Sequence, residues 1–462
     1  MLILLLLAVW TSPLAAGPGD QGLELAIPET LAPSWQRILA DHPLPDGLEI
    51  VDQAGGGRLS MKLVRGGAAP GSGTWKMVER TFFAPVGRLG EADRGMGATL
   101  PLEQIRLPLV ALPVDGLFPD QPGYPLVEEV ALGIESSDPS VIAWYESIAE
   151  APPLGQTRAI LWIGAVGDIM PARGVDALLQ RPDGLERVFG DTLPLLASCG
   201  ILLGNLEGAA TRRGEKAAKT YTFRFDPAAL AKLAEAGFTH LSLANNHSFD
   251  FGETGFLDTL EALERVGIAA PGAGRNLAEA QSATEIAAAG MTVRVLSFGA
   301  YPVDRMGFDG RRTASATEAR PGILWLDEES LAAAALQFGP DSFDIAMVHG
   351  GEEWSSEPTA GQRRLYRRLI DAGADLVVGS HPHVLQGTEA AGGGLIAYSL
   401  GNFLFPGMEG TKGGEDSAIL RVGVYRGAIR YVQAYPVRLS GTTVRRQVAE
   451  PAPAGVPPMG VP

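Results

Sequence analysis

The sequence predicts an α/β fold for most of the chain, and three observations support this prediction. Apolar residues make up 46% and charged residues 19% of the 462 residues, a balance that is typical of a globular protein. Short apolar runs alternate with amphipathic stretches over residues 158–440. Polar motifs recur directly after the apolar runs, as expected where the strands of an α/β sheet end at a ligand site.

Seven apolar runs are predicted to be the strands. Residues 159–166 are apolar except for Gly164, as expected for a parallel strand that is buried on both faces. The other predicted strands are Ile201–Leu203, Leu241–Ala244, Val293–Phe298, Ile345–Val348, Leu376–Val378 and Leu395–Leu400.

Helices are predicted between several of these strands from their end signals. Asp226 is a typical N-cap, and Pro227 suits the first helical position after it. Residues 253–266 place their apolar side chains on one face and stop at a glycine. Thr359 is expected to cap a helix over residues 360–372. This alternation of strands and helices indicates an α/β sheet.

The N-terminal segment predicts the location of the protein. Residues 1–16 contain the apolar run Leu2–Trp10, which is too short to span a bilayer because a spanning helix needs about 20 residues. The run and the small residues after it are typical of a secretory signal peptide, although no Lys or Arg precedes them. We therefore expect a secreted or periplasmic protein of the cell envelope.

Composition divides the rest of the chain. Residues 17–152 are rich in proline and glycine and predict a smaller α+β N-terminal domain. Within it, Thr81–Val86 resembles the short segment with which solute-binding proteins cross between their lobes. Residues 151–155 read as a linker, and residues 441–462 are predicted to be a disordered tail.

The charge of the chain restricts its partners. The net charge is −16, so the protein should repel nucleic acid and anionic lipid. It would also repel a polyanionic substrate at long range. Any anion-binding site must therefore be locally positive or contain metal.

Five polar motifs predict a metal site, because each of them follows a predicted strand and ligands bind at the carboxyl ends of such strands. The residues that reach this edge are Asp168, Glu207, Asn246, His349, His381 and His383. Each one alone would more often be a turn, a cap or a buried histidine. Together, imidazoles and carboxylates suit Mn, Zn or Fe. The His-Pro-His spacing is expected to put both imidazoles on one side of an extended segment.

The motifs, taken in order, resemble those of the CapA family of capsule and poly-γ-glutamate synthesis. They read Gly-Asp-Ile-Met, Asn-Leu-Glu-Gly, Asn-Asn-His, His-Gly-Gly-Glu-Glu, Gly-Ser-His-Pro-His-Val and Tyr-Ser-Leu-Gly-Asn-Phe. The family belongs to the calcineurin-like metallophosphatase superfamily. The resemblance therefore implies a two-sheet α/β sandwich with its site at the strand ends.

The resemblance also implies which residues bind the metals. Glu207 matches the carboxylate that bridges two divalent ions. The further ligands that it implies are Asn246, His349 and His381 for one ion and Asp168 and His383 for the other. One departure is Met170, which stands where the wider superfamily has a histidine. Methionine is a poor ligand for hard divalent ions, so one or two ions are expected, and binuclear phosphatase activity is in doubt.

The remaining roles concern the substrate. His247 matches the unligated histidine that stabilises charge on the substrate or protonates a leaving group. Arg173 and Lys219 lie near the motifs and are expected to hold an anionic group. Glu353, with its neighbour Glu352, is expected to hold an ammonium group or to orient His349.

Two functions are consistent with these residues. The first is a metal-dependent, phosphoesterase-like hydrolase in the synthesis or processing of a capsule polymer, with a phosphate ester or a γ-glutamyl polymer as its substrate. The second is a metal-containing binding or assembly factor for an anionic envelope polymer. The presence of His247 favours catalysis, and Met170 favours binding. Either role implies partners in envelope biosynthesis.

Overall fold

The computed structural model divides the protein into two compact units, which we describe separately. The first comprises Met1–Phe83 and Leu117–Thr157, and the second comprises Ala84–Gly116 and Arg158–Pro462. Within them, the structure describes residues 22–26, 31–44, 49–51, 57–65, 75–89, 99–119, 121, 124–136, 138–150, 160–304 and 306–447.

Two β-sheets form the framework of the second unit. The strands of the first sheet are β8 (Leu161–Ile169), β9 (Ile201–Leu206), β12 (His240–Ser242), β21 (Asn402–Leu404), β22 (Asp416–Tyr425), β23 (Ala428–Ser440) and β24 (Thr443–Arg446). Their order is β12-β9-β8-β22-β23-β24, and β21 also pairs with β8. β8, β9 and β12 are parallel, whereas β22, β23 and β24 continue the sheet as antiparallel strands.

The second sheet is parallel at its centre. Its strands are β14 (Thr284–Ala288), β15 (Met291–Ala300), β17 (Ser342–Gly350), β18 (Leu376–Ser380), β19 (Thr388–Ala391) and β20 (Gly394–Ala397). They are ordered β14-β15-β17-β18-β20-β19, and only the edge strands β14 and β19 run antiparallel to their neighbours among these strands. Two short pairs join β10 (Ala209–Ala210) with β11 (Arg224–Phe225) and β13 (Ala273–Gly274) with β16 (Gly322–Ile323).

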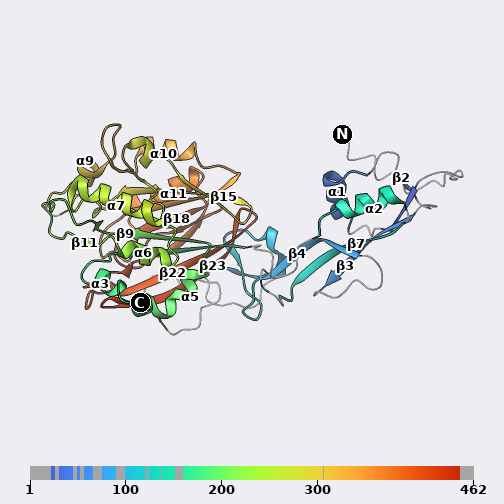
Figure 1. The fold of residues 1–462 in the computed structure, drawn as a ribbon, viewed down its shortest axis with the longest axis horizontal. Coiled ribbons are helices and arrows are strands. Elements are labelled where there is room, and N and C mark those ends of the chain that lie inside the picture. The colour runs from blue at the N-terminus through green and yellow to red at the C-terminus, as the bar shows by residue number, and fades with distance from the viewer. Residues whose placement is uncertain are drawn as a thin grey trace. The chain divides into compact units, whose positions relative to one another are not determined.

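Helices cover both sheets (Figure 1). They are α3 (Val175–Leu179), α4 (Gly184–Phe189), α5 (Leu193–Ala197), α6 (Ala229–Glu235), α7 (Gly252–Val266), α8 (Leu277–Ala280), α9 (Gly310–Ala314), α10 (Glu328–Ala335) and α11 (Ala360–Asp371).

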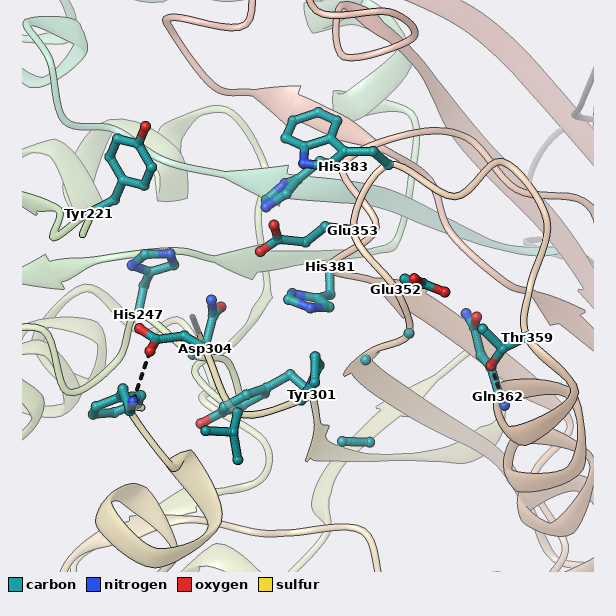
Figure 2. Close-up of a pocket in the computed structure, with 18 of the residues that line it drawn as sticks. Tyr221, His247, Tyr301, Asp304, Glu352, Glu353, Thr359, Gln362, His381 and His383 are labelled. Atoms are coloured by element: carbon teal, nitrogen blue, oxygen red, sulfur yellow. Dashed lines mark hydrogen bonds between the residues drawn. The ribbon is translucent and has the colours of Figure 1, made fainter. Parts of the chain in front are cut away.

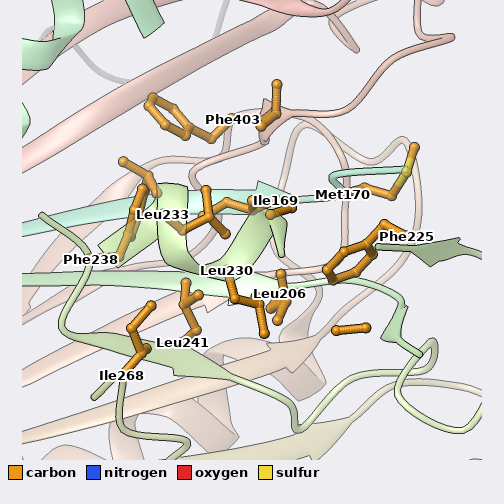
Figure 3. Packing of buried hydrophobic residues seen from close by; sticks show 14 of the residues in the cluster. Ile169, Met170, Leu206, Phe225, Leu230, Leu233, Phe238, Leu241, Ile268 and Phe403 are labelled. Carbon is orange, nitrogen blue, oxygen red and sulfur yellow. The ribbon is translucent and has the colours of Figure 1, made fainter. Parts of the chain in front are cut away.

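Alternating side chains bury both faces of each sheet. Along β9, Ile201 and Leu203 belong to the apolar cluster between the sheets, whereas Leu202 packs in the cluster that includes α6 and α7. Figure 3 shows Leu230 and Leu233 of α6 in this outer cluster. A third cluster packs α10 and α11 against the second sheet. The resulting α/β/β/α layers confirm the predicted two-sheet sandwich.

The predicted strands are all present, although their bounds differ. β8 continues through Asp168, so this carboxylate lies within the strand and not after it. β20 ends at Ala397, three residues before the predicted end. Two helix predictions are confirmed in detail, because Gly267 ends α7 with φ +75° and Thr359 Oγ1 accepts a hydrogen bond from the backbone N–H of Gln362 at 3.1 Å.

The antiparallel half of the first sheet was missing from the prediction. Buried polar side chains such as Arg421 and Arg430 interrupt the apolar pattern of β22 and β23. The prediction of a disordered tail from residue 441 was also wrong at its start. β24 pairs with β23 and buries Val444, whereas residues 448–462 lie outside the described residues.

Among its described residues, the first unit contains one mixed sheet and two helices. Its elements are β1 (Gly22–Ala26), α1 (Ala32–Asp41), β2 (Glu49–Val51), β3 (Gly57–Arg65), the first part of β4 (Trp75–Arg88), β7 (Val127–Ser136) and α2 (Pro139–Ser147). Trp35 of α1 packs edge to face on Trp144 of α2, with 6.1 Å between ring centroids. The Trp144 indole N–H donates to the carbonyl of His42 at 3.0 Å, so both helices are fixed to one small core.

Residues 84–116 group with the second unit, although the predicted N-terminal domain spans 17–152. This segment contains β5 (Thr99–Pro101) and β6 (Leu109–Ala111), and β6 pairs with the end of β4. Val110 and Leu112 are buried in the cluster between the two sheets, so the apolar side chains of this segment complete the larger core. The likeness to solute-binding proteins stays a prediction.

The predicted signal peptide, residues 1–16, lies outside the described residues. Among the helices that the structure does describe, none combines the length and the apolar character that crossing a membrane requires. The location of the protein stays a prediction.

His240 predicts a pH dependence of stability. It lies in β12 with a buried side chain, and its Nδ1 is 2.9 Å from Thr239 Oγ1. Burial lowers the pKa of His240 from 6.5 to about 4, so the unfolded chain takes up a proton at a pH where the folded chain does not. We therefore expect this residue to lower the free energy of unfolding by up to about 3 kcal/mol as the pH falls from about 6.5 to about 4.

Chemical denaturation of the wild type and of His240→Gln across this pH range checks the expectation. Glutamine does not titrate, so the wild type should lose more stability on acidification than the variant does. The difference between the two proteins isolates this side chain from all other titrating groups. Parallel stability curves would contradict the prediction.

Candidate metal centre

The carboxyl ends of parallel strands from both sheets bring the predicted ligands together. Asp168 lies in β8, Glu207 directly follows β9, and residues 245–247 come soon after β12. His349 lies near the end of β17, and residues 381–383 directly follow β18. All six predicted metal ligands therefore reach one edge of the sandwich.

Asp168, Glu207 and His349 form a buried group of metal-binding atoms. Each offers a ligand atom within 4.8 Å of the others, and their side chains have no exposed surface. The Nε2 of His349 lies 3.5 Å from Glu207 Oε1, and its Nδ1 lies 3.8 Å from Asp168 Oδ1. Two carboxylates and an imidazole at these separations suit a divalent transition metal.

Two further potential metal-ligand atoms lie close to Nε2 of His349. Asn246 Oδ1 lies 3.0 Å from His349 Nε2, and His381 Nδ1 lies 3.1 Å from it. The other nitrogen of His349 is 2.9 Å from Ser380 Oγ, which fixes the orientation of the ring. Donors from separate segments thus converge on the position that the resemblance assigns to one metal.

Two hydrogen-bond acceptors fix the orientation of the His383 ring. Its Nδ1 lies 2.9 Å from Asn402 Oδ1 and 3.2 Å from Asp168 Oδ2. The Asn402 amide nitrogen donates to the carbonyls of His383 and Gly414, so its oxygen must face the ring. Since both neighbours of Nδ1 are acceptors, Nδ1 carries the proton and Nε2 is left as the ligand atom.

Sequence reasoning missed the amides that hold the ligands. Asn205 Nδ2 donates to Asp168 Oδ1 at 2.9 Å and to Glu207 Oε1 at 3.3 Å. Asn245 Nδ2 in turn donates to Asn205 Oδ1 at 3.1 Å. Asn205 and Asn402 both stand inside the motifs quoted for the family resemblance. The place of Asn205 two residues before Glu207 was a signal that could have identified it, whereas Asn402 lies nineteen residues from the ligand that it contacts.

The His-Pro-His segment is not extended, contrary to prediction. His381 has φ +97° and His383 has φ +59°, which places both in the left-handed region that histidine seldom adopts. Their ring centroids are nevertheless 6.0 Å apart, and both rings line one cavity. The loop therefore presents the two rings together through backbone strain and not through strand alternation.

Burial and like charges perturb the titration of this cluster. Burial, followed by the charge of Asp168, raises the pKa of Glu207 well above its usual value. Burial lowers the pKa of His349 and of His381 well below the usual value, and neighbouring histidines add to this effect. Burial alone would lower the pKa of His383, but Glu207 and Asp168 raise it to about 9. The carboxylates and imidazoles compete for protons that a divalent cation would replace.

Two buried atoms support this fit. Glu207 Oε2 and His381 Nε2 have no hydrogen-bond partner among the residues that the structure describes. A buried acceptor without a partner costs about 1–3 kcal/mol, and both atoms belong to groups that bind cations. The donor set thus fits a divalent metal ion.

His247 belongs to a separate network beside the ligands. Its Nδ1 lies 2.7 Å from Asp250 Oδ2, and Lys219 Nζ lies 2.7 Å from Asp250 Oδ1. Burial lowers the pKa of His247, and Asp250 opposes that effect. Lys219 also donates to the carbonyl of Asn246 and lines the cavity over this centre, so its contact with an anionic substrate group stays a prediction. Sequence reasoning missed Asp250, which holds both side chains.

A cavity of about 1460 Å³ opens over this centre. Figure 2 shows His247, His381 and His383 along its wall, with Glu353 between the two latter rings. Arg173 also lines it, donates to the carbonyl of Pro406 and packs 5.1 Å from the ring of Phe223. The cavity thus joins a cationic side chain and the predicted proton-transfer residue to the candidate metal site.

Met170 does not contribute a donor. Its side chain is buried in the outer apolar cluster, near Phe225 (Figure 3). Its backbone N–H donates to the carbonyl of Leu404 at 2.7 Å, which fixes the end of β8. The thioether therefore packs in the core, and β8 supplies Asp168 alone to the metal centre.

Comparison with known proteins places this centre in a family. Residues 162–407 match the family described as "Bacterial capsule synthesis protein PGA_cap". The "Capsule biosynthesis protein CapA" of Bacillus anthracis is 32% identical over 282 residues, which cover 59% of this chain and 66% of that protein. The "PGA biosynthesis protein CapA" of Bacillus subtilis is 30% identical over 289 residues, covering 62% of this chain and 73% of that protein.

The chain is also similar to two further proteins. A "Probable polyglutamine synthesis accessory protein" of Mycobacterium tuberculosis is 30% identical, covering 63% of this chain and 78% of that protein. The crystal structure of a hypothetical protein from Thermus thermophilus has a TM-score of 0.39 and 15% identity, covering 60% of this chain and all of that one. The matched family region, 162–407, contains every predicted metal ligand.

Proposed function

This chain belongs to the PGA_cap family of bacterial capsule synthesis proteins, and from that membership we propose that it is a metal-dependent hydrolase of the phosphoesterase type. Its role would be the synthesis or processing of an anionic polymer of the poly-γ-glutamate type. The observation that carries the proposal is the convergence of imidazole, carboxylate and amide donors on one wall of a large cavity. The names of the Bacillus relatives support the polymer, since they refer to capsule and PGA biosynthesis.

The chemistry follows from the side chains around the cavity. A divalent cation at this centre would supply the positive charge that activates water near neutral pH and polarises a phosphoryl or acyl oxygen. Asp250 accepts from Nδ1 of His247, so Nε2 is the atom through which His247 exchanges a proton with the reacting group. Arg173 supplies positive charge at the cavity wall, which an anionic substrate needs in a protein of net charge −16.

Substitution of His247 separates proton transfer from metal binding. His247→Gln is expected to lower turnover about 100-fold or more, because a positioned acid–base group contributes about 10²–10⁴ to the rate. Its metal content should equal that of the wild type, because His247 lies outside the ligand set. Initial rates and elemental analysis on the same sample measure both quantities.

The matched control for this experiment is His240→Gln, a histidine buried in β12 and away from the cavity lining. At neutral pH it should keep wild-type turnover. If His247→Gln and His240→Gln turn over substrate equally fast, His247 has no part in proton transfer.

A location in the cell envelope is part of the proposal. It rests on the apolar run Leu2–Trp10 and on the capsule polymer named for the relatives. Cell fractionation with an antibody to the protein tests it, and recovery of the protein in the cytoplasm alone would exclude it.

A second candidate function is that of a binding or assembly factor that holds polymer carboxylates through its metal without cleaving them. The packing of Met170 in the core favours it, because β8 then provides one ligand where the wider superfamily has two. Phosphate esters and γ-glutamyl polymers, assayed with added Mn²⁺ or Zn²⁺, distinguish the two functions. Metal-dependent product formation supports hydrolysis, whereas polymer retention without product supports binding.

A further inference from the structure

A second group of metal-binding atoms lies at the mouth of the cavity. Glu353, His381 and His383 each offer a ligand atom within 4.8 Å of the others. Figure 2 shows the Glu353 carboxylate between the two imidazole rings. None of these residues belongs to the buried group of Asp168, Glu207 and His349. The Nδ1 of His381 faces His349, which leaves its Nε2 for the second group.

Both histidines can direct a ring nitrogen at this position. Nδ1 of His383 faces the acceptors Asn402 Oδ1 and Asp168 Oδ2, so Nε2 is the ring atom left to bind a cation. Nε2 of His381 is buried and has no hydrogen-bond partner among the described residues, and the side chain as a whole is 2% exposed. An unpartnered ring nitrogen beside a carboxylate and a second imidazole fits the coordination of a divalent cation.

Glu353 completes the set from the solvent side. It follows β17 in the loop Gly351–Trp354, and its side chain is exposed. The indole of Trp354 lies 5.4 Å from the ring of His383, and the Trp354 backbone N–H donates to the Pro382 carbonyl at 2.9 Å. These contacts tie the Glu353 loop to the histidine loop, so the carboxylate is held near both rings.

We propose that Glu353, His381 and His383 bind a second divalent cation, at the open mouth of the cavity and beside the buried site. Two imidazoles and one carboxylate suit Zn, Mn or Fe and leave coordination positions free. All three residues line the cavity, so a substrate carboxylate or phosphoryl group there would be able to reach such a cation. Met170, which stands where the wider superfamily has a histidine, packs in the core and provides no ligand. Glu353 would provide one to the same centre.

This inference deepens the proposed function, since it assigns the anion of the substrate to the solvent-facing cation of the same centre. It also replaces the expected role of Glu353 as a residue that holds ammonium. A purely structural role, in which Glu353 accepts a hydrogen bond from His381, makes a different prediction for glutamine. The amide oxygen of glutamine still accepts such a bond but is a much weaker cation ligand.

The test is a count of bound Mn²⁺ on the full chain. Wild type, Glu353→Gln and Glu352→Gln are stripped of metal, dialysed against a range of Mn²⁺ concentrations and analysed for bound ions. Glu352 is the matched control, because it is the adjacent glutamate and does not belong to the group of ligand atoms that Glu353 forms with the two histidines. Both positions are exposed, so neither change should prevent folding.

We expect two Mn²⁺ ions per chain for the wild type and for Glu352→Gln. Glu353→Gln should lose the weaker ion or bind it at least tenfold less tightly. Wild-type stoichiometry and affinity in Glu353→Gln would overturn the inference, as would a wild type that binds a single ion whatever stands at position 353. Either result would overturn the second cation site alone. The proposed hydrolysis is tested separately, by the turnover assay.

Discussion

Asp168→Ala and His381→Ala proteins are expected to lose metal-dependent turnover by about 1,000-fold or more. Asp168 accepts from Asn205 and lies beside His349 and His383, so its removal leaves three side chains without their shared partner. Lewis-acid activation contributes several kcal/mol to such reactions, and about 4 kcal/mol corresponds to a factor of 1,000 in rate. The loss should therefore exceed that of any single substrate contact.

Two readouts make this test specific. Bound metal should fall together with turnover, and excess Mn²⁺ should restore part of the activity if affinity is the cause. Asp183→Ala and His42→Ala replace the same residue types outside the cavity lining and should keep wild-type values. Full turnover in both Asp168→Ala and His381→Ala would exclude a metal-dependent reaction at this centre.

Gly167→Ala is expected to destabilise the second unit by about 3 kcal/mol or more. An added Cβ at Gly167 would lie 1.9 Å from the carbonyl oxygen of Gly401, which no rotamer change can relieve. That oxygen accepts from the Asp168 N–H at 3.0 Å, and the next residue, Asn402, holds His383. The backbone of residues 400–402 must therefore shift, and the metal centre should be distorted with it.

Gly339→Ala is the matched control for this change. The position has open space around its Cβ, with no atom within 4 Å, so stability should change by less than about 0.5 kcal/mol. Thermal and chemical denaturation of both variants, with bound metal measured on the same samples, give the comparison. Equal stability of the two alanine variants would show that residues 400–402 move aside at little cost.

The parallel strands could be predicted because they are continuous apolar runs. A strand that is buried on both faces, such as β17, contains a continuous run of apolar residues, so it is easily recognised in the sequence. β22 and β23 were missed because Arg421 and Arg430 are buried inside them. Arg421 lies 3.7 Å over the ring of Trp162, a tertiary contact that the local sequence does not indicate.

The ligands could be predicted for a similar reason. A histidine or carboxylate directly after a buried strand has few other uses when five such positions recur. The residues that orient them were harder to find. Asp250 lies three residues after His247 and Asn402 nineteen residues after His383, and each acts only through the folded position of its partner. Glu353 was assigned to substrate because its distance to His381 and His383 depends on how two loops pack.

The predicted metal ligands come from both sheets, and this has a mechanical consequence. Asp168 and Glu207 come from the first sheet, and His349 and His381 come from the second. A cation bound to Asp168, Glu207 and His349 would resist any sliding of one sheet over the other. Binding energy that favours the native state alone adds to its stability, by about 2.7 kcal/mol at 100 times the dissociation constant. The ion would thus act as a cross-link between the two halves of the sandwich as well as a reagent.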